Sequence, residues 1–146
     1  MSENIGFLKL LIAFFRIIRS LLTHMTLYLM LLIIGPIVIV FLFFFRKKFP
    51  TKAAFIWSIF TCAVGGIEVD IEGRYHLDKD DVQVIIANHQ SSFDIHAIII
   101  ALNPFYYRFV AKKELSFMPI FGWALWLSGF PLVDRKNNEQ AVISMK

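Results

Sequence analysis

The stretch that decides the fold is VQVIIANHQSSFD, residues 82–94. Its opening run is almost continuously β-branched, which predicts a strand buried on both faces of a sheet. His89 and Asp94 follow at the point where that strand should end and a helix should begin. The carboxyl end of a central strand is where open α/β sheets usually build their sites. These two residues are therefore the first candidates for catalysis.

The two side chains suit general-base chemistry. A neutral imidazole can take a proton from an alcohol near neutral pH. A carboxylate can accept the other ring N–H, which selects the tautomer and stabilises the imidazolium that forms. Inside one helix, a separation of five positions would turn the pair about 140° apart around the axis. They can meet only if His89 lies in the turn and Asp94 in the first helical turn, with Ser91 or Ser92 as a natural N-cap.

Simpler interpretations use the same residues. Ser91-x-x-Asp94 also resembles a capping box, in which the carboxylate would only cap a helix. His89 could be an ordinary strand-end histidine, because a His-x4-Asp spacing often arises by chance. No Cys, His or carboxylate pair has metal-ligand spacing, so no metal is expected. The other histidines lack partners at a useful spacing and are expected to be structural or surface residues: His24, His76 and His96.

Helices and short strands alternate on both sides of this stretch. Helices are expected at residues 49–64, 92–102 and 119–127, and another is expected to begin at residue 136. Strands are expected at residues 67–72, 82–87, 106–111 and 130–133. This alternation predicts an α/β fold in which a layered sheet is flanked by helices.

The chain divides by charge and hydropathy. It is 58% hydrophobic, above the roughly 45–50% of an average soluble chain. Residues 1–48 carry six basic and one acidic residue, a net charge of +5, whereas residues 49–146 carry nine basic and ten acidic residues. We expect a membrane-anchoring helical segment at 1–48 and an α/β domain at 49–146. No basic run with interleaved aromatics indicates nucleic-acid binding. The single cysteine, Cys62, fits a domain that faces the cytosol.

The anchoring segment has two apolar parts. Residues 25–45 carry no charge, and a helix of that length can cross a hydrocarbon core of roughly 30 Å before the basic stop at 46–48. Residues 5–22 favour a helix in the membrane interface, because three cations fall on one side of it: Lys9, Arg16 and Arg19. Gly35-Pro36 could kink the second part. A spanning helix and a bent, partly inserted helix therefore both remain open, although a signal peptide is not expected.

Two motifs in order resemble the PlsC, or 1-acylglycerol-3-phosphate acyltransferase, family. NHQSSFD at residues 88–94, after a hydrophobic strand, resembles the first motif of the family. GFPLVDR at residues 129–135 resembles the second, normally Gly-x-x-(Phe/Leu)-(Ile/Val)-Asp-Arg. Between them, KKEL at 112–115 and the Pro-x-x-Gly at 119–122 follow the usual course of the family. The resemblance covers residues 60–146.

The resemblance implies an acyltransferase of phospholipid biosynthesis. The acyl group would pass directly from acyl-CoA or acyl carrier protein to the sn-2 hydroxyl of lysophosphatidic acid, and no cofactor is implied. His89 would be the general base and Asp94 its orienter. The resemblance also implies a membrane location, expected at a bacterial inner membrane with the catalytic domain on the cytoplasmic side.

Four further residues acquire a role in substrate binding by this resemblance. Asp134 and Arg135 match the second motif, and Arg135 would help hold the acceptor phosphate, because its planar guanidinium can bind two phosphate oxygens. Lys112 and Lys113 would approach the phosphate or the thioester donor. Without the first motif, Asp134-Arg135 would be a surface charge pair at a strand end, and the two lysines could simply be solvated.

The later motifs of the family are absent. A third motif, typically Glu-Gly-Thr-Arg, and a fourth that contains proline should follow the second, and neither occurs in these 146 residues. We therefore expect a truncated product or fragment with an incomplete sheet. The alternative function is a non-catalytic membrane-bound module that binds lipid or an acyl-carrier partner.

Overall fold

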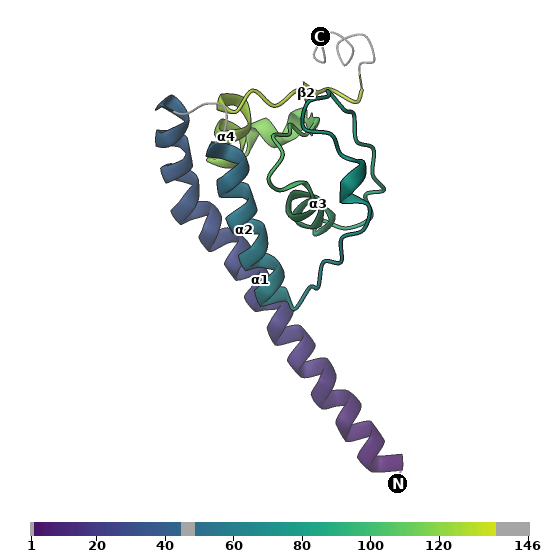
Figure 1. Cartoon of the computed structure of the whole chain (residues 1–146). Coiled ribbons are helices and arrows are strands. Elements are labelled where there is room, and N and C mark those ends of the chain that lie inside the picture. Colours follow the sequence, from purple (N-terminus) through teal and green to yellow (C-terminus); the bar gives the residue numbers. More distant parts are fainter. Residues whose placement is uncertain (1, 45–48, 137–146) are drawn as a thin grey trace.

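A long N-terminal helix lies beside shorter helices and one small pair of strands (Figure 1). The structure, a computed structural model, describes residues 2–44 and 49–136. The predicted basic stop at 46–48, and all but the first residue of the helix predicted from Lys136, lie outside these residues. In chain order the elements are α1 (Ser2–Phe44), α2 (Phe49–Gly65), the 3₁₀ turn η1 (Arg74–His76), α3 (Asp94–Leu102), β1 (Ala111–Lys112), the 3₁₀ turn η2 (Lys113–Phe117), α4 (Phe121–Leu127) and β2 (Leu132–Val133).

α1 is one unbroken helix, where the sequence predicts two parts. Near the expected junction, Thr23 Oγ1 donates to the backbone oxygen of Arg19 over 2.8 Å, and His24 Nδ1 lies 2.7 Å from the backbone oxygen of Ser20. Both side chains thus bond to carbonyls of the preceding turn and do not cap a new helix. Pro36 lies inside α1, where it removes one backbone hydrogen bond without ending the helix.

The surface of α1 supports membrane association. Its 43 residues extend roughly 65 Å, and most of it is long and apolar enough to cross a membrane by length and composition. Exposed apolar residues recur at steps of three or four and form a continuous stripe along one face. This apolar stripe consists of Phe7, Leu11, Phe14, Ile18, Leu22, Met25, Leu29, Leu32, Pro36, Val40 and Phe43. The core helix of a soluble protein would bury such a stripe.

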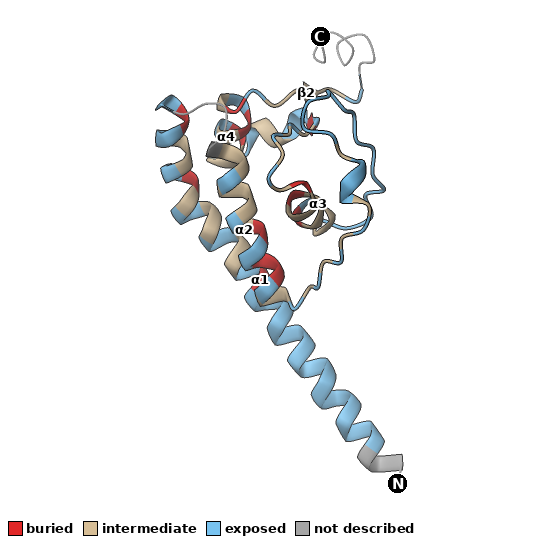
Figure 2. Ribbon diagram, viewed as in Figure 1, coloured by how far each residue is buried: buried red, intermediate tan, exposed pale blue. Residues whose placement is uncertain are grey.

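The core is small and lies where the four helices meet. α2 packs along the later half of α1 and also contacts α3, while α4 contacts α1 (Figure 1). Gly35 allows the approach of α4, because a Cβ at this position would overlap the side chain of Ile120. Residues 5–22 of α1 are exposed on all sides (Figure 2). The buried side chains among the described residues are Thr23 and Leu42 of α1, Ser58, Thr61 and Cys62 of α2, His96, Ile99 and Leu102 of α3, Ala111 of β1, Leu125 of α4, and Ser128.

The sheet is smaller than the sequence predicts. β1 and β2 pair in parallel, with Ala111 opposite Leu132 and Lys112 opposite Val133. These two short strands form a two-stranded sheet. The strands predicted at 106–111 and 130–133 are longer than the strands observed. The described chain is therefore mostly helical, and the layered α/β prediction is only partly confirmed.

Residues 67–72 and 82–87 form no strand, although the sequence predicts one in each. Residues 67–72 do alternate between half-buried apolar and exposed acidic side chains. Along 82–87, however, Val82, Val84 and Ile86 are 95%, 87% and 92% exposed. A β-branched run becomes a buried strand only with strands beside it and helices over it. The described residues supply neither, so the prediction of a buried central strand was wrong.

Candidate active site

His89 and Asp94 form the pair that the sequence predicts. His89 lies in the loop before α3, and Asp94 is the first residue of that helix. His89 Nδ1 lies 3.2 Å from Asp94 Oδ2. An ionised carboxylate can only accept, so Nδ1 carries the proton and donates it to this bond. The side chains are 55% and 32% exposed, so a substrate can reach them.

The loop between the pair is organised around the Asp94 carboxylate. The same oxygen, Oδ2, accepts the backbone N–H groups of Gln90 and Ser91, each over 2.7 Å. Ser91 Oγ in turn accepts the N–H of Phe93 over 3.2 Å. The N–H groups of Ser91 and Gln90, followed by the smaller contribution of His89, lower the pKa of the Asp94 carboxyl below its usual value. Asp94 is therefore ionised near neutral pH and holds the loop in place.

Asp94 satisfies both the capping and the orienting interpretations. Its bond from the N–H of Ser91 is one half of a capping box, and the same oxygen faces His89. The helix start thus holds the carboxylate where His89 needs an acceptor. The helix as assigned begins one residue after Phe93, which has no side-chain cap of its own. Ser91 nevertheless makes the bonds of the predicted cap, because its Oγ accepts the N–H of Phe93 and its own N–H bonds to Asp94.

The second nitrogen of His89, Nε2, is available for chemistry. Among residues 2–44 and 49–136, none bonds to it. With the proton on Nδ1, Nε2 presents a lone pair that can accept a proton from a hydroxyl group. The arrangement supplies a base and its orienter, and no described serine or cysteine bonds to His89 as a nucleophile.

The second motif is positioned by the two-stranded sheet. The parallel register places Lys113 and Asp134 just beyond paired residues of β1 and β2. Lys113 Nζ lies 3.4 Å from Asp134 Oδ2, and Asp134 Oδ1 accepts the N–H of Lys136 over 2.9 Å. The N–H of Lys136 and then the Lys113 ammonium lower the pKa of the Asp134 carboxyl. The sheet thus holds Lys112 and Lys113 next to the second motif.

The remaining predicted binding residues differ in their surroundings. Lys112 Nζ lies 3.4 Å from Glu114 Oε1, so both predicted lysines face carboxylates. Arg135 is exposed, and within the described part of the chain no carboxylate pairs with it. Among the four predicted binding residues, Arg135 therefore offers its cation most directly to an anionic ligand.

The two motifs remain separate in the described structure. No hydrogen bond or ion pair among residues 2–44 and 49–136 joins the His89–Asp94 pair to Lys113, Asp134 or Arg135. The same residues hold no cluster of three His, Cys, Asp or Glu side chains that could bind a metal ion. The structure thus joins His89 to Asp94 as predicted, pairs Asp134 with Lys113 and not with Arg135, and forms no hydrogen bond or ion pair between the two motifs among these residues.

A buried polar pair behind the site was not predicted. Ser58 Oγ of α2 lies 3.1 Å from His96 Nδ1 of α3, and the His96 ring packs against Trp57 and Phe93. Burial lowers the pKa of the His96 imidazole. The structural role expected of His96 is confirmed. The sequence carries no signal for its partner, because Ser58 lies 38 positions earlier in an apolar helix.

Comparison with known proteins places these motifs in a family. The sequence model of the Acyltransferase family matches residues 68–146, more than half of the chain and both motifs. The chain belongs to the acyltransferase family. The predicted PlsC-type resemblance is thereby confirmed. No solved structure matches the chain.

Relatives of this acyltransferase carry names that agree with the family. A 1-acyl-sn-glycerol-3-phosphate acyltransferase of Chlamydomonas reinhardtii is 30% identical over 80% of this chain and 34% of its own length. The alpha enzyme of Homo sapiens is 35% identical over 55% of this chain and 28% of its own length. The chloroplastic enzyme of Arabidopsis thaliana is 27% identical over 83% of this chain and 33% of its own length. The acyltransferase chain thus matches about a third of the length of these relatives.

Proposed function

We propose that the chain transfers a fatty acyl group from a thioester to the sn-2 hydroxyl of lysophosphatidic acid, which gives phosphatidic acid. The observation that carries this proposal is the His89–Asp94 bond of 3.2 Å, with the carboxylate held by two backbone N–H groups. The names of the relatives support the choice of acceptor, because they are acyltransferases of 1-acyl-sn-glycerol 3-phosphate. The exposed apolar stripe of α1 supports a lipid substrate.

The proposed reaction needs one base and no covalent intermediate on the protein. His89 Nε2 takes the proton of the acceptor hydroxyl while its oxygen attacks the thioester carbonyl carbon. The tetrahedral intermediate then collapses, the C–S bond breaks, and His89 returns the proton to the departing thiolate. Asp94 stabilises the imidazolium between these two steps. One ester bond replaces one thioester bond, and His89 is regenerated.

Substrate binding falls to the second motif in this proposal. Arg135 would bind the acceptor phosphate through its planar guanidinium. Asp134 would keep Lys113 in place, since the two side chains are paired, and Lys112 would lie beside the acceptor phosphate or the donor. The thioester donor would be acyl-CoA or acyl carrier protein, and the reaction draws on no cofactor.

The proposed location is a membrane with the site facing the cytoplasm, as at a bacterial inner membrane. The length and apolar surface of α1 support a membrane location, and the single cysteine, Cys62, fits a reducing compartment. A second function, binding of lipid or an acyl carrier without catalysis, is favoured by one observation: the two motifs make no direct bond among the described residues.

One assay separates the two functions. Thiol release from acyl-CoA would be measured for the detergent-purified chain with and without lysophosphatidic acid, comparing the native sequence with His89→Ala and His76→Ala. His76 is the matched control, because it is another exposed histidine and lies in η1. The proposal expects acceptor-dependent release that His89→Ala abolishes and His76→Ala retains.

The other outcomes are equally informative. Acceptor-dependent release that persists in His89→Ala would refute the general-base role. Binding of lysophosphatidic acid without thiol release from any of the three proteins would favour the non-catalytic module.

A further inference from the structure

A basic recess lies between α1 and the loop that carries the first motif. It has a volume of about 270 Å³. α1 contributes one wall, Gly65 at the end of α2 and Ile67 contribute another, and Phe93 closes it. Its lining residues are Arg16, Arg19, Ser20, Thr23, Gly65, Ile67 and Phe93. Arg16 and Arg19 are three positions apart, so their side chains are neighbours on one face of the helix.

The recess carries two positive charges without a carboxylate partner. No acidic side chain of residues 2–44 and 49–136 forms an ion pair with Arg16 or Arg19. By contrast, Lys112 and Lys113 each face a carboxylate at 3.4 Å. Two adjacent guanidinium groups without an internal anion are suited to an external one, and phosphate oxygens match their planar donors.

The backbone beside Arg19 leaves room for its guanidinium group. Gly66 has a φ of +60°, and a Cβ at this position would come within 2.6 Å of Arg19 Nη1. The missing side chain of Gly66 thus lets the backbone after α2 lie directly against the guanidinium group in its present position. The recess is therefore formed by tertiary packing, whereas the charges come from α1 alone.

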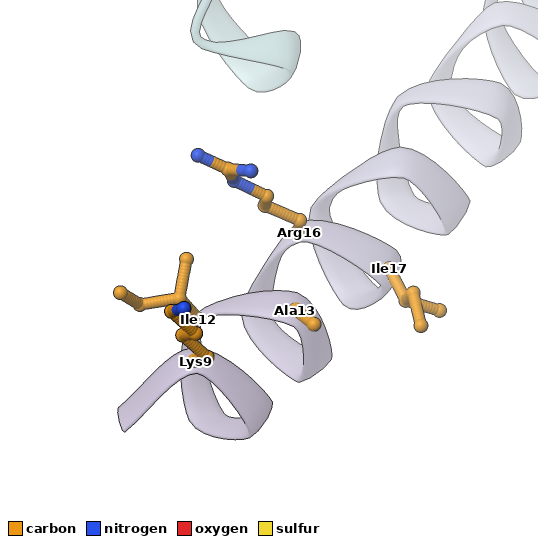
Figure 3. A pocket seen from close by; sticks show the side chains of 5 residues that line it. All are labelled: Lys9, Ile12, Ala13, Arg16 and Ile17. Atoms are coloured by element: carbon orange, nitrogen blue, oxygen red, sulfur yellow. The ribbon is translucent and has the colours of Figure 1, made fainter. Parts of the chain in front are cut away.

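Arg16 lies on the side of α1 opposite the apolar stripe, and Arg19 lies between the two faces, about 100° from Ile18. Ile18 of the stripe follows Arg16 by two positions, which places the two about 160° apart around the helix. Arg16 also lines a second groove of about 530 Å³ with Lys9, Ile12, Ala13 and Ile17, and Figure 3 shows Arg16 and Ile17 leaving the helix in different directions. With the stripe in the acyl chains, the arginines point toward the level of the lipid phosphates.

We propose that the Arg16–Arg19 recess binds the phosphate of an anionic phospholipid headgroup in the surface of the membrane that α1 contacts. Two positive charges next to an exposed apolar stripe match the charge and depth of such a headgroup. Phe93 links the recess to the first motif, because it is the residue immediately before Asp94. A bound headgroup therefore holds the His89 loop at the membrane surface. This role is distinct from acyl transfer and does not depend on it.

The test compares the association of two lipids with the chain in one bilayer. The chain would be reconstituted in phosphatidylcholine, and spin-labelled phosphatidylglycerol and phosphatidylcholine would report their relative association constants. The native chain should prefer phosphatidylglycerol, and Arg16→Gln/Arg19→Gln should lower that preference by about tenfold or more. Lys52→Gln/Lys79→Gln is the control, because it removes the same charge from two exposed lysines outside the recess.

Two charge-preserving variants distinguish a built site from diffuse attraction. Arg16→Lys/Arg19→Lys keeps both charges and loses the planar donors, and Gly66→Asn tolerates the positive φ while crowding Arg19. Both should lose most of the preference while circular dichroism shows unchanged helix content. If both retain it, or if Lys52→Gln/Lys79→Gln loses as much as the arginine variant, the proposed site is wrong. Loss of the preference on adding inorganic phosphate at constant ionic strength would identify a site for free phosphate and overturn the assignment to a lipid headgroup.

Discussion

Replacement of Ser58 by alanine should weaken the attachment of α3 to α2. The change removes the hydrogen bond of 3.1 Å between Ser58 Oγ and His96 Nδ1. Ser58 is 0% and His96 8% exposed, so water cannot easily replace the lost partner. An unpaired buried polar atom costs about 1–3 kcal/mol. The higher helix propensity of alanine offsets up to about 0.5 kcal/mol of this cost. The expected net loss is about 0.5–2.5 kcal/mol in the free energy of unfolding.

The measurement is a denaturant titration of the detergent-solubilised chain, followed by far-ultraviolet circular dichroism. Thr26→Ala is the matched control, because Thr26 is also a helical residue whose hydroxyl bonds within the chain, to the backbone oxygen of Leu22, but at an exposed position. It should change the free energy of unfolding by less than about 0.5 kcal/mol. The double variant Ser58→Ala/His96→Leu should recover most of the loss of Ser58→Ala, since it removes both polar atoms of this pair and leaves neither of them unpaired.

Two results would contradict this reasoning. One is a loss below about 0.5 kcal/mol for Ser58→Ala, which would mean that His96 finds another partner. The other is a double variant that loses as much as the two single variants added together, which would mean that the hydrogen bond does not couple the two side chains.

Three further predictions follow from the described contacts. Asp94→Asn should lower kcat of acyl transfer by about 10²-fold, near the lower end for general-base catalysis because the pair is exposed, and unchanged steady-state kinetics would refute its orienting role. The free energy of unfolding should decline as the pH falls from the ordinary histidine pKa to the lowered pKa of His96, because in this interval the unfolded chain protonates His96 and the folded chain does not. Denaturant titrations between about pH 5 and pH 8 should show this decline, and the His96→Leu variant should lack the part that comes from His96. Gly122→Ala should lower the melting temperature, because a Cβ there would overlap the backbone oxygen of Ser116, whereas Gly6→Ala, with open space around it, should raise or maintain it.

The contact between His89 and Asp94 could be predicted because its geometry is local. His89 and Asp94 are five positions apart, and the turn into a helix is enough to bring them together. The N–H groups that hold the carboxylate belong to Gln90 and Ser91, inside the same loop. The sequence could also predict α3 closely, because Asn103-Pro104 marks its end.

The strands could not be predicted in the same way. The β-branched run at 82–87 has the composition of a buried strand, yet its side chains face solvent in the described chain. A strand exists only through hydrogen bonds to a neighbouring strand, and composition does not say whether that neighbour is present. The short pair β1–β2 shows the converse, since pairing with each other is what makes these four residues a sheet.

By itself, the sequence determined the features that depend on neighbouring residues: the apolar and basic faces of α1, the ends of α3 and α4, and the His89–Asp94 pair. Only the tertiary structure decided which distant groups meet. It placed Ser58 against His96, Lys113 against Asp134, and the end of α2 against Arg19. The physical reason is that helix periodicity and capping act over a few positions, whereas burial, ion pairing and strand pairing require that chain segments far apart in sequence lie side by side.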